Sequence, residues 1–301
     1  MPPSWTNPVP SDRREHTMSN QTVGILHPGN MGISIAASAQ NSGCHVYWVS
    51  EGRSAQTHER AAKHNLRDAR TLQNLCHTCP ILVSVCPPHA AEEVADQVLA
   101  CGFNGLYLDA NAISPQRAKR IGERMAAAGV DFVDGGIIGG PAWEPGNTWL
   151  YLAGEQASDV ADCFSAGPLE TSVIGEAIGK ASALKVCYAA WTKGSTALLS
   201  AILAAADTLD VWDELRVQWD RDWPDFADRA VHRARRVTAK AWRFAGEMDE
   251  ISSTFEAAGV PGDFHAGAAS LYRRIAHFKD APEMPSLEEV LHSLTTPDTG
   301  A

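Results

Sequence analysis

The sequence predicts an α/β fold in which a Rossmann-type, doubly wound and mainly parallel sheet is followed by an all-helical C-terminal domain. From residue 22 onwards, short β-branched or apolar runs alternate with alanine-rich amphipathic stretches, the pattern of a parallel sheet with helices on both faces. After about Glu176 the chain is poor in glycine and helical in its spacing. A chain of 301 residues is also long enough for two domains with separate cores.

Short strand-like runs and amphipathic stretches define the expected elements. The candidate strands are Thr22–Leu26, His45–Val49, Ile81–Cys86, Gly105–Asp109, Asp131–Val133, Trp149–Ala153 and Thr171–Ile174. The helices expected between them are Met31–Ser42, Gln56–His64, Ala90–Leu99 and Pro115–Ala128. In the second domain, helices are expected over Lys180–Leu209, Trp212–Gln218, Pro224–Ala258, Ala266–His277 and Leu287–Leu294. The first of these would be about 45 Å long, enough to cross a domain junction.

We divide the chain into three parts on this basis. Residues 1–20 are polar and rich in proline, and we expect them to form a disordered tail. Residues 21–175 make up the expected Rossmann domain, and residues 176–301 the expected helical domain. A helical domain of this size commonly pairs with its copy, so we expect a homodimer.

Composition limits the partners and the compartment. A formal net charge of −11 disfavours nucleic acid and anionic membrane surfaces as partners. The sequence has no apolar run near the roughly 20 residues of a membrane span, and its first residues lack the apolar centre of a secretory signal. Seven scattered cysteines favour reduced thiols and a cytoplasmic protein. The pair Cys76-x-x-Cys79 lacks a second ligand pair, so we interpret it as structural and expect no metal site.

A turn between the first strand and the first helix resembles a phosphate-binding loop. The segment from Gly24 to Gly32 ends in His-Pro-Gly-Asn-Met-Gly, where His27 stands in the first glycine position of a G-x-G-x-x-G pattern. Gly29 and Gly32 keep the positions that allow close approach of backbone to a pyrophosphate and close packing of helix on strand. We expect Gly29, Asn30 and Met31 to contact the cofactor at the positive helix end.

The end of the second strand indicates which dinucleotide is bound. NAD-binding versions of this fold have an acidic side chain there for the ribose hydroxyls, but this chain has Ser50. Arg53 and Ser54 follow, and they can hold a 2′-phosphate through charge-assisted hydrogen bonds. We therefore expect NADP(H) to be preferred over NAD(H). In the alternative reading, Glu51 takes the hydroxyls and Arg53 is a solvated loop charge.

The ordered series of motifs resembles the β-hydroxyacid dehydrogenase superfamily, which includes 3-hydroxyisobutyrate dehydrogenase, phosphogluconate dehydrogenase and the imine reductases. Within the superfamily, the sequence is most similar to the branch called "phosphogluconate dehydrogenase, NAD-binding, putative-like". The resemblance runs from about residue 22 to 278. Cys86, Pro87 and Pro88 resemble a loop that covers the cofactor. The segment Asp109–Pro115 resembles one beside the nicotinamide ribose, which makes Asn111 a candidate contact. The resemblance also implies a homodimer.

Two further motifs imply the catalytic and substrate residues. The segment Asp134–Pro141 resembles the family's substrate loop, so Ile138, Gly139 and Gly140 are candidate substrate contacts. The stretch from Gly179 resembles the family's G-x-G-x-x-x-K helix, which makes Lys185 the counterpart of the catalytic lysine. Hydride delivery to a carbonyl leaves an alkoxide, and a partly buried ammonium can stabilise and protonate it. Without the motif, a lysine here would be read as a solvated or snorkelling residue.

Helical spacing adds further candidates to the substrate site. Tyr188, Thr192 and Thr196 share the helix face of Lys185 at 100° per residue. Both a pocket-lining role and a packed aromatic with a surface hydroxyl remain open for Tyr188.

Three positions depart from the family pattern. Ile138 stands where a serine holds the substrate carboxylate, Ala189 replaces an asparagine, and Gly246-Glu247 replaces a second lysine and an aspartate. A cation and two hydrogen-bond donors are therefore missing, so we expect a substrate that is larger or less acidic than 3-hydroxyisobutyrate, or one that is gripped elsewhere. His265 and Glu247 are candidate replacements, although either can be a satisfied structural residue.

The sequence favours NADPH-linked reversible reduction of a carbonyl to an alcohol, with Lys185 as the proton donor or acceptor. Imine reduction is the alternative, because imine reductases share the architecture and generally replace the lysine by aspartate or tyrosine, and Tyr188 lies one turn away. A non-catalytic NADP-binding protein is the third reading, since the turn at His27 is degraded and the carboxylate ligands are missing. In the favoured reading, the domain of residues 21–175 binds NADP, and that of residues 176–301 binds substrate and forms the dimer.

Overall fold

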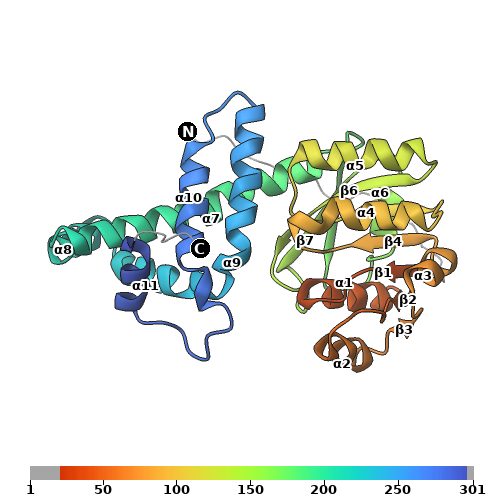
Figure 1. The fold of residues 1–301 in the computed structure, drawn as a ribbon, viewed down its shortest axis with the longest axis horizontal. Helices are drawn as coiled ribbons and strands as arrows, with labels where there is room; N and C mark the ends of the chain where they lie inside the picture. Colours follow the sequence, from red (N-terminus) through yellow and green to blue (C-terminus); the bar gives the residue numbers. More distant parts are fainter. Residues whose placement is uncertain (1–20, 297–301) are drawn as a thin grey trace.

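The computed structural model describes residues 21–296. These residues form a sheet domain and a helical domain joined by one long helix (Figure 1). The tail expected over residues 1–20 lies outside the described residues. Strand β8 ends at Gly175 and helix α7 begins at Lys180, so the change of architecture falls close to the expected boundary at residue 175.

The sheet domain contains a mixed sheet that is mainly parallel, as predicted. Its strands are β1 (Thr22–Ile25), β2 (His45–Trp48), β3 (Arg67–Asp68), β4 (Ile81–Ser84), β5 (Leu106–Asp109), β6 (Asp131–Gly139), β7 (Thr148–Ala153) and β8 (Glu170–Gly175). Their order in the sheet is β3-β2-β1-β4-β5-β6-β7-β8. Every neighbouring pair is parallel except β6 and β7, which are antiparallel.

Helices cover both faces of this sheet. They are α1 (Asn30–Asn41), α2 (Ala55–Lys63), α3 (Leu72–Thr78), the short 3-10 helix η1 (Pro88–Ala90), α4 (Ala91–Ala100), α5 (Pro115–Ala127) and α6 (Ala157–Asp162). Alternate residues of a strand face opposite sides, so Ile81 and Val83 of β4 join the core beneath α1, while Leu82 joins the core beneath α4 and α5. The doubly wound architecture is therefore confirmed.

Some elements differ from those expected. The strand expected over Asp131–Val133 continues to Gly139, because the consecutive residues Gly135 and Gly136 remain extended and pair with β7. Strand β3 and helices α3 and α6 were not expected, since each is short.

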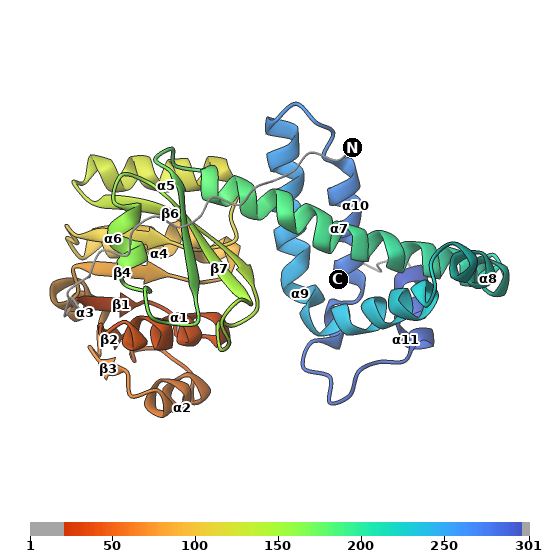
Figure 2. The same cartoon turned by 180° about the vertical axis from the view of Figure 1, so that it is seen from behind.

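The second domain is all-helical, as predicted. Its helices are α7 (Lys180–Thr208), α8 (Trp212–Asp222), α9 (Phe226–Ala257), α10 (Asp263–Arg274), the 3-10 helix η2 (Ala276–Phe278) and α11 (Leu287–Thr295). Figure 2 shows α7 running from the sheet across the helical domain towards α8. A third core lies between α7, α9, α10 and α11. Within residues 21–296, no helix combines the length and apolar character needed to cross a membrane.

Strand β6 fixes where α7 begins. The buried carboxylate of Asp134 accepts hydrogen bonds from the backbone N–H groups of Gly179, Ala181 and Ser182, at 2.9, 2.9 and 3.1 Å. It therefore satisfies the free donors of the first turn of α7. The helix approaches β6 so closely that a Cβ atom on Gly136 would lie 2.5 Å from the carbonyl oxygen of Ala181. Glycine at this position allows the contact that brings Lys185 to the sheet.

Candidate functional site

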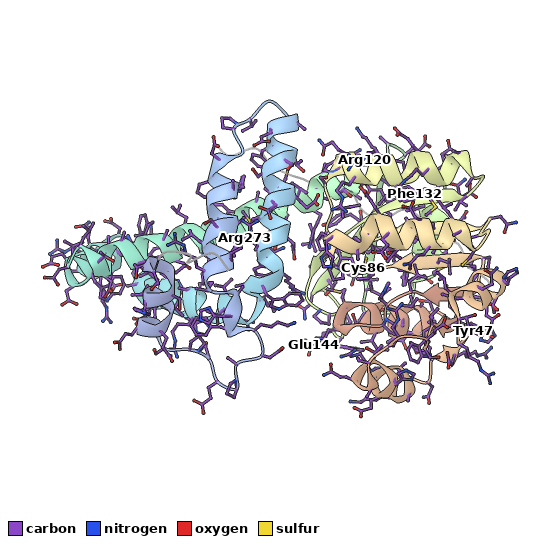
Figure 3. The ribbon with its side chains drawn as sticks, viewed as in Figure 1. Tyr47, Cys86, Arg120, Phe132, Glu144 and Arg273 are labelled. Carbon is purple, nitrogen blue, oxygen red and sulfur yellow. The ribbon has the colours of Figure 1, made fainter. Side chains whose placement is uncertain are left out.

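The candidate site lies at the carboxyl edge of the sheet. In this strand order β1 lies between β2 and β4. The chain adds β2 and β3 on one side of β1, and then crosses to the other side to add β4 and the strands after it. Ligands of open α/β sheets bind outside the carboxyl ends of the strands at such a switch point. The segments after β1, β4, β5 and β6 all reach this edge because these strands are parallel. Figure 3 labels Cys86, which follows β4, on the side of the sheet domain that faces α9.

The turn after β1 presents the start of α1 to solvent. Gly29 is the N-cap residue of α1, no side chain caps the helix, and its first turn has no acidic residue. The carbonyl oxygen of His27 packs against Gly32, where a Cβ atom would lie only 2.1 Å away. Gly29 and Asn30 are exposed, and Met31 is partly buried. These three predicted contacts therefore surround an uncapped positive helix end that can bind a phosphate.

A small cavity of about 160 Å³ lies beside this turn, lined by residues that include His27, Glu51 and Arg53. Two nitrogens at its wall, Nδ1 of His27 and Nε of Arg53, are buried and have no hydrogen-bond partner. Burial, and to a lesser extent the charge of Arg53, lowers the pKa of His27 to about 4. His27 is thus a neutral imidazole at neutral pH. Because buried polar groups in folded proteins normally have partners, the two nitrogens indicate a wall shaped for a polar ligand.

Two arginines hold the turn from the α2 side. Arg53 donates from Nη2 to the carbonyl oxygen of Leu26 at 3.2 Å, and Arg60 donates from Nη1 to that of Pro28 at the same distance. Ser54 caps α2 by accepting from the N–H of Thr57, so its hydroxyl is already engaged. Ser50 is partly buried where β2 ends, and its carbonyl oxygen accepts from the N–H of Arg53. The sequence reasoning missed Arg60, because its contact with Pro28 joins residues 32 positions apart.

These features fit a dinucleotide. The uncapped start of α1, the close approach at Gly32, and the unpaired nitrogens of His27 and Arg53 are what its pyrophosphate and adenosine halves require.

The segments after β4 and β5 are tied together by one side chain. Asn111 is buried, its Oδ1 accepts from the N–H of Cys86 at 2.6 Å, and its Nδ2 donates to Oγ of Ser84 at 3.1 Å. Burial raises the pKa of the neighbouring Asp109 to about 7. Pro87 is exposed and Pro88 begins η1, so both lie on the rim beside α9. Asn111 therefore positions the loop of Cys86, and its amide is not free to turn towards a ligand.

Lys185 reaches the end of β6 from the second turn of α7. Its ammonium donates a hydrogen bond to the carbonyl oxygen of Ile137. Burial lowers the pKa of Lys185 to about 8, and the charge of Lys193 acts in the same direction, while Glu247 opposes them. An ammonium with a pKa near neutrality can both donate and accept a proton at physiological pH. The structure thus brings Lys185 together with the predicted loop at Gly139.

A lysine from another element lies near the position where the family's second lysine is replaced. Lys193, two turns beyond Lys185 on α7, forms a shielded ion pair with Glu247 of α9, and the ammonium lies 4.7 Å from the ring centre of Phe244. Burial disfavours the ionised form of Glu247, but Lys193 and Lys185 outweigh it and hold its pKa below the usual value. Gly246 and Glu247 thus replace the family's second lysine and aspartate as the sequence indicated, and the lysine that reaches this region comes from α7 with its charge balanced by Glu247. The two missing hydrogen-bond donors remain missing.

The other predicted substrate residues differ in exposure. Ile138 is buried in β6, and Gly140 is exposed with its carbonyl oxygen bound by Oγ1 of Thr148 at 2.8 Å. Gly139 has a φ of 127°, and a Cβ atom there would lie 2.3 Å from the carbonyl oxygen of Asn147. Glycine is therefore required at this bend for both conformation and space.

On α7, Tyr188 is half-exposed, and the hydroxyl of Thr192 donates to the carbonyl oxygen of Tyr188. Thr196 is buried, and its hydroxyl accepts from Arg233 of α9 at 2.6 Å. His265 is buried against Gly194, nine residues or about 13 Å of helix beyond Lys185. The structure therefore separates Thr196 and His265 from the end of β6 and leaves Tyr188 accessible.

Cys76 lies in α3 and Cys79 is the C-cap residue of that helix, and both are buried in the core on this face of the sheet. Burial raises the pKa of each thiol to about 12, so both are protonated at neutral pH. Among residues 21–296, no group of histidine, cysteine, aspartate and glutamate side chains is arranged to hold a metal ion.

Comparison with known proteins identifies the class of the sheet domain. Residues 22–163 match the NAD binding domain of 6-phosphogluconate dehydrogenase, and residues 206–275 match a domain of unknown function, DUF1932. A protein of 28.5 kDa from Methanothermus fervidus, itself uncharacterised, is 29% identical over 55% of this chain and 63% of its own length. The mitochondrial 3-hydroxyisobutyrate dehydrogenase of Drosophila melanogaster is 26% identical over 46% of this chain and 43% of its own. The matches thus span less than two thirds of either relative.

Solved structures share the whole fold. The 3-hydroxyisobutyrate dehydrogenase of Mycobacterium tuberculosis, solved with L-serine, has a TM-score of 0.67 at 17% identity and covers 92% of this chain and 100% of its own. A reductive aminase from Aspergillus terreus with NADPH and ethyl levulinate scores 0.53 at 15% identity, covering 91% and 99%. An imine reductase variant from Myxococcus stipitatus with NAD+ scores 0.52 at 18% identity, covering 92% and 100%. The family models and the shared fold match the β-hydroxyacid dehydrogenase superfamily that the motifs resemble.

Proposed function

We propose that this protein is an NADP-dependent oxidoreductase that transfers a hydride between NADPH and a carbonyl or alcohol substrate. The observation that carries the proposal is the position of Lys185, whose partly buried ammonium, with a pKa of about 8, lies where the dinucleotide edge of the sheet meets the helical domain. The domain that matches an NAD-binding family supplies the nucleotide site. Relatives that are dehydrogenases and reductases support redox chemistry.

In the proposed reaction, a bound NADPH would supply the hydride that the carbonyl carbon accepts. The carbonyl π electrons move to oxygen, and the alkoxide takes a proton from the ammonium of Lys185, giving the alcohol. The hydrogen bond to the carbonyl oxygen of Ile137 orients this ammonium at the end of β6. Lys185 then regains a proton from solvent. In the oxidative direction, neutral Lys185 accepts the proton of the alcohol.

The cofactor preference rests on the end of β2. A 2′-phosphate requires cations and no competing carboxylate close by, and Arg53 and Arg60 both lie at the turn after β1. Glu51 lines the same cavity but is exposed, so it can turn to solvent. Similar folds have been solved with NADPH and with NAD+, so the preference depends on these side chains and not on the fold.

The proposed substrate differs from a small hydroxy acid. Ile138 and Ala189 offer no hydrogen bond to a carboxylate, and the nearby ion pair of Lys193 and Glu247 carries no net charge. An aldehyde or ketone whose reacting end is uncharged therefore fits best.

We further propose that residues 21–175 bind the cofactor, that residues 176–301 bind substrate and form a homodimer, and that the protein acts in the cytoplasm.

The test combines cofactor binding with a substrate panel. NADPH should bind more tightly than NADH in a fluorescence titration, and Arg53→Ala should lose at least tenfold in NADPH affinity with little effect on NADH, as loss of a charge-assisted bond implies. Lys185→Ala should abolish turnover of any active aldehyde or ketone, whereas Lys180→Ala, an exposed lysine at the start of α7, should retain it. Wild-type turnover by Lys185→Ala would remove the assigned proton donor.

Imine reduction is the second candidate, favoured by the half-exposed Tyr188 one turn beyond Lys185 and by the imine reductase fold. A panel of cyclic imines assayed beside the carbonyl panel separates the two. Turnover of imines alone, sensitive to Tyr188→Phe and not to Lys185→Ala, would favour this candidate.

A further inference from the structure

Helix α5 begins beside the predicted nicotinamide segment without a cap of its own. Its N-cap residue is Ser114, whose side chain makes no capping hydrogen bond, and the helix has no acidic residue in its first turn. In a capping box, the third helical residue is Glu or Gln, and its side chain accepts from the N–H of the N-cap residue. Here the third residue is Arg117, which cannot accept.

A carboxylate from the other domain takes this place. Glu250 of α9 accepts from the N–H of Ser114 through Oε2 at 2.8 Å, and its Oε1 forms an ion pair with Arg117. Only 15% of the Glu250 side chain and 17% of the Arg117 side chain are exposed, so the pair is shielded from solvent. Arg117 is also bound to Glu92 of α4 at 3.2 Å. Glu250 thus completes from α9 the cap that α5 lacks.

The two residues of this contact, Ser114 and Glu250, belong to segments on opposite sides of the candidate site. Ser114 follows Asn111 by three residues, and Asn111 holds the N–H of Cys86. Glu250 follows Glu247 by three residues on α9, which is the spacing of one helix face, and Glu247 holds Lys193 beside Lys185. One face of α9 therefore contacts both the lysine cluster and the segment on the dinucleotide side.

The helical domain also has a second anchor, at Asp134, where α7 leaves β6. An anchor at one end of α7 leaves the helical domain free to swing about that point. A second contact, made through α9 to the start of α5, removes this freedom.

We propose that Glu250 is an interdomain positioning residue, which caps α5 from the helical domain and thereby fixes the separation between Lys185 and the dinucleotide edge. Its effect on catalysis rests on the proposed function, whereas its effect on domain arrangement does not. Release of this cap opens the site, and its formation restores the catalytic geometry.

The first test needs no substrate. Glu250→Ala should raise amide exchange at Ser114 and in the first turn of α5 at least tenfold, in line with loss of a hydrogen bond to a charged group, and should increase the radius of gyration from small-angle scattering. Asp249→Ala is the matched control, because Asp249 is adjacent on α9 and pairs with Arg273 inside the helical domain. It should leave both quantities unchanged. Wild-type exchange at Ser114 in Glu250→Ala would overturn the proposal, whatever the reductase activity.

The second test separates positioning from stability. With the panel carbonyl that is turned over fastest, Glu250→Ala should lower kcat per folded enzyme by about tenfold to a hundredfold while the Kd for NADPH changes less than about twofold, because small displacements of reacting groups reduce rate more than binding. Glu250→Gln keeps an oxygen for the N–H of Ser114 but loses the charge, so its kcat should be intermediate. A lower melting temperature in both variants with unchanged kcat would show that Glu250 is merely structural.

Discussion

At the scale of single residues, the surroundings of Lys185 balance two opposing charges. Burial and Lys193 favour its neutral form, whereas Glu247 favours the ammonium. The result is a pKa of about 8, below the usual value for lysine but still high enough for most molecules to be protonated at pH 7. A proton donor needs this combination, because a lysine with an ordinary pKa releases its proton reluctantly.

This balance predicts the pH dependence of the proposed reaction. Carbonyl reduction requires the ammonium, so its rate should fall as pH rises through about 8, and alcohol oxidation should rise over the same range. Lys193→Met removes a like charge, which raises the pKa of Lys185 and should move both limbs to higher pH. Glu247→Gln removes an opposite charge and should move them to lower pH. Profiles of kcat in the two variants that shift in the same direction would contradict this electrostatic account.

The sequence predicted Lys185 but not its partners. Lys185 belongs to a local pattern that begins at Gly179, so the motif alone identifies it. Lys193 and Glu247 are separated by 54 residues and meet only when α7 packs on α9. The same reason explains why Arg60 was missed, since its contact with Pro28 depends on how α2 folds back over the turn.

At the scale of elements, the packing of α7 on β6 depends on one missing side chain. A Cβ atom at Gly136 would lie 2.5 Å from the carbonyl oxygen of Ala181 and 3.3 Å from Cβ of Lys185. Neither backbone can yield without moving the other, because Asp134 holds the first turn of α7 to the same strand.

Gly136→Ala should therefore displace α7 and Lys185 together. We expect a loss of about 1–3 kcal/mol in the free energy of unfolding, typical of overpacking a core, with a fall in turnover. Gly267→Ala is the control, since Gly267 is exposed on α10 with nothing within 4 Å of the added atom. It should stabilise the protein by about 0.5–1 kcal/mol, as expected in a helix. Chemical denaturation measures both, and a neutral Gly136→Ala would contradict the close contact.

Sequence patterns predicted the long elements better than the short ones. Apolar periodicity extends over most of α7 and α9, so both were expected within a few residues of their bounds. Strand β3 consists of two exposed charged residues, Arg67 and Asp68, and has no apolar pattern to detect. The predicted strand over Asp131–Val133 was too short because Gly135 and Gly136 weaken strand propensity. In the structure, pairing of β6 with β7 keeps these two glycines extended.

At the scale of the whole molecule, the sequence predicted two domains but not how they are joined. The boundary near residue 175 follows from a change in composition, whereas the contacts of Asp134 with α7 and of Glu250 with α5 join residues far apart in the chain. Each is a carboxylate that satisfies backbone donors at a helix start, and no local pattern identifies its target. These two contacts join the sheet domain to the helical domain, together with the packing of α7 on β6 and of α9 near η1.

The outer end of the helical domain exposes apolar side chains beside α8. Helix α8 has no buried residue and lies at the end farthest from the sheet (Figure 1). Leu209 and Trp223, which flank it, are 70% and 54% exposed, and Trp191 on α7 is 73% exposed. Exposed large apolar side chains that lie together mark interaction sites, although Trp212 and Trp219 of α8 pack against the helical core.

We expect a second copy of this chain to cover that surface. A twofold dimer would bring α8 and its flanking residues against the partner, and because such an interface is self-complementary, one substitution alters it twice. The double variant Leu209→Glu with Trp223→Glu should therefore sediment as a monomer at micromolar concentration, where the wild type should sediment as a dimer. Val173→Glu, which changes a residue 45% exposed on β8 of the sheet domain, should remain dimeric. A monomeric wild type would show that another partner, or solvent alone, faces α8.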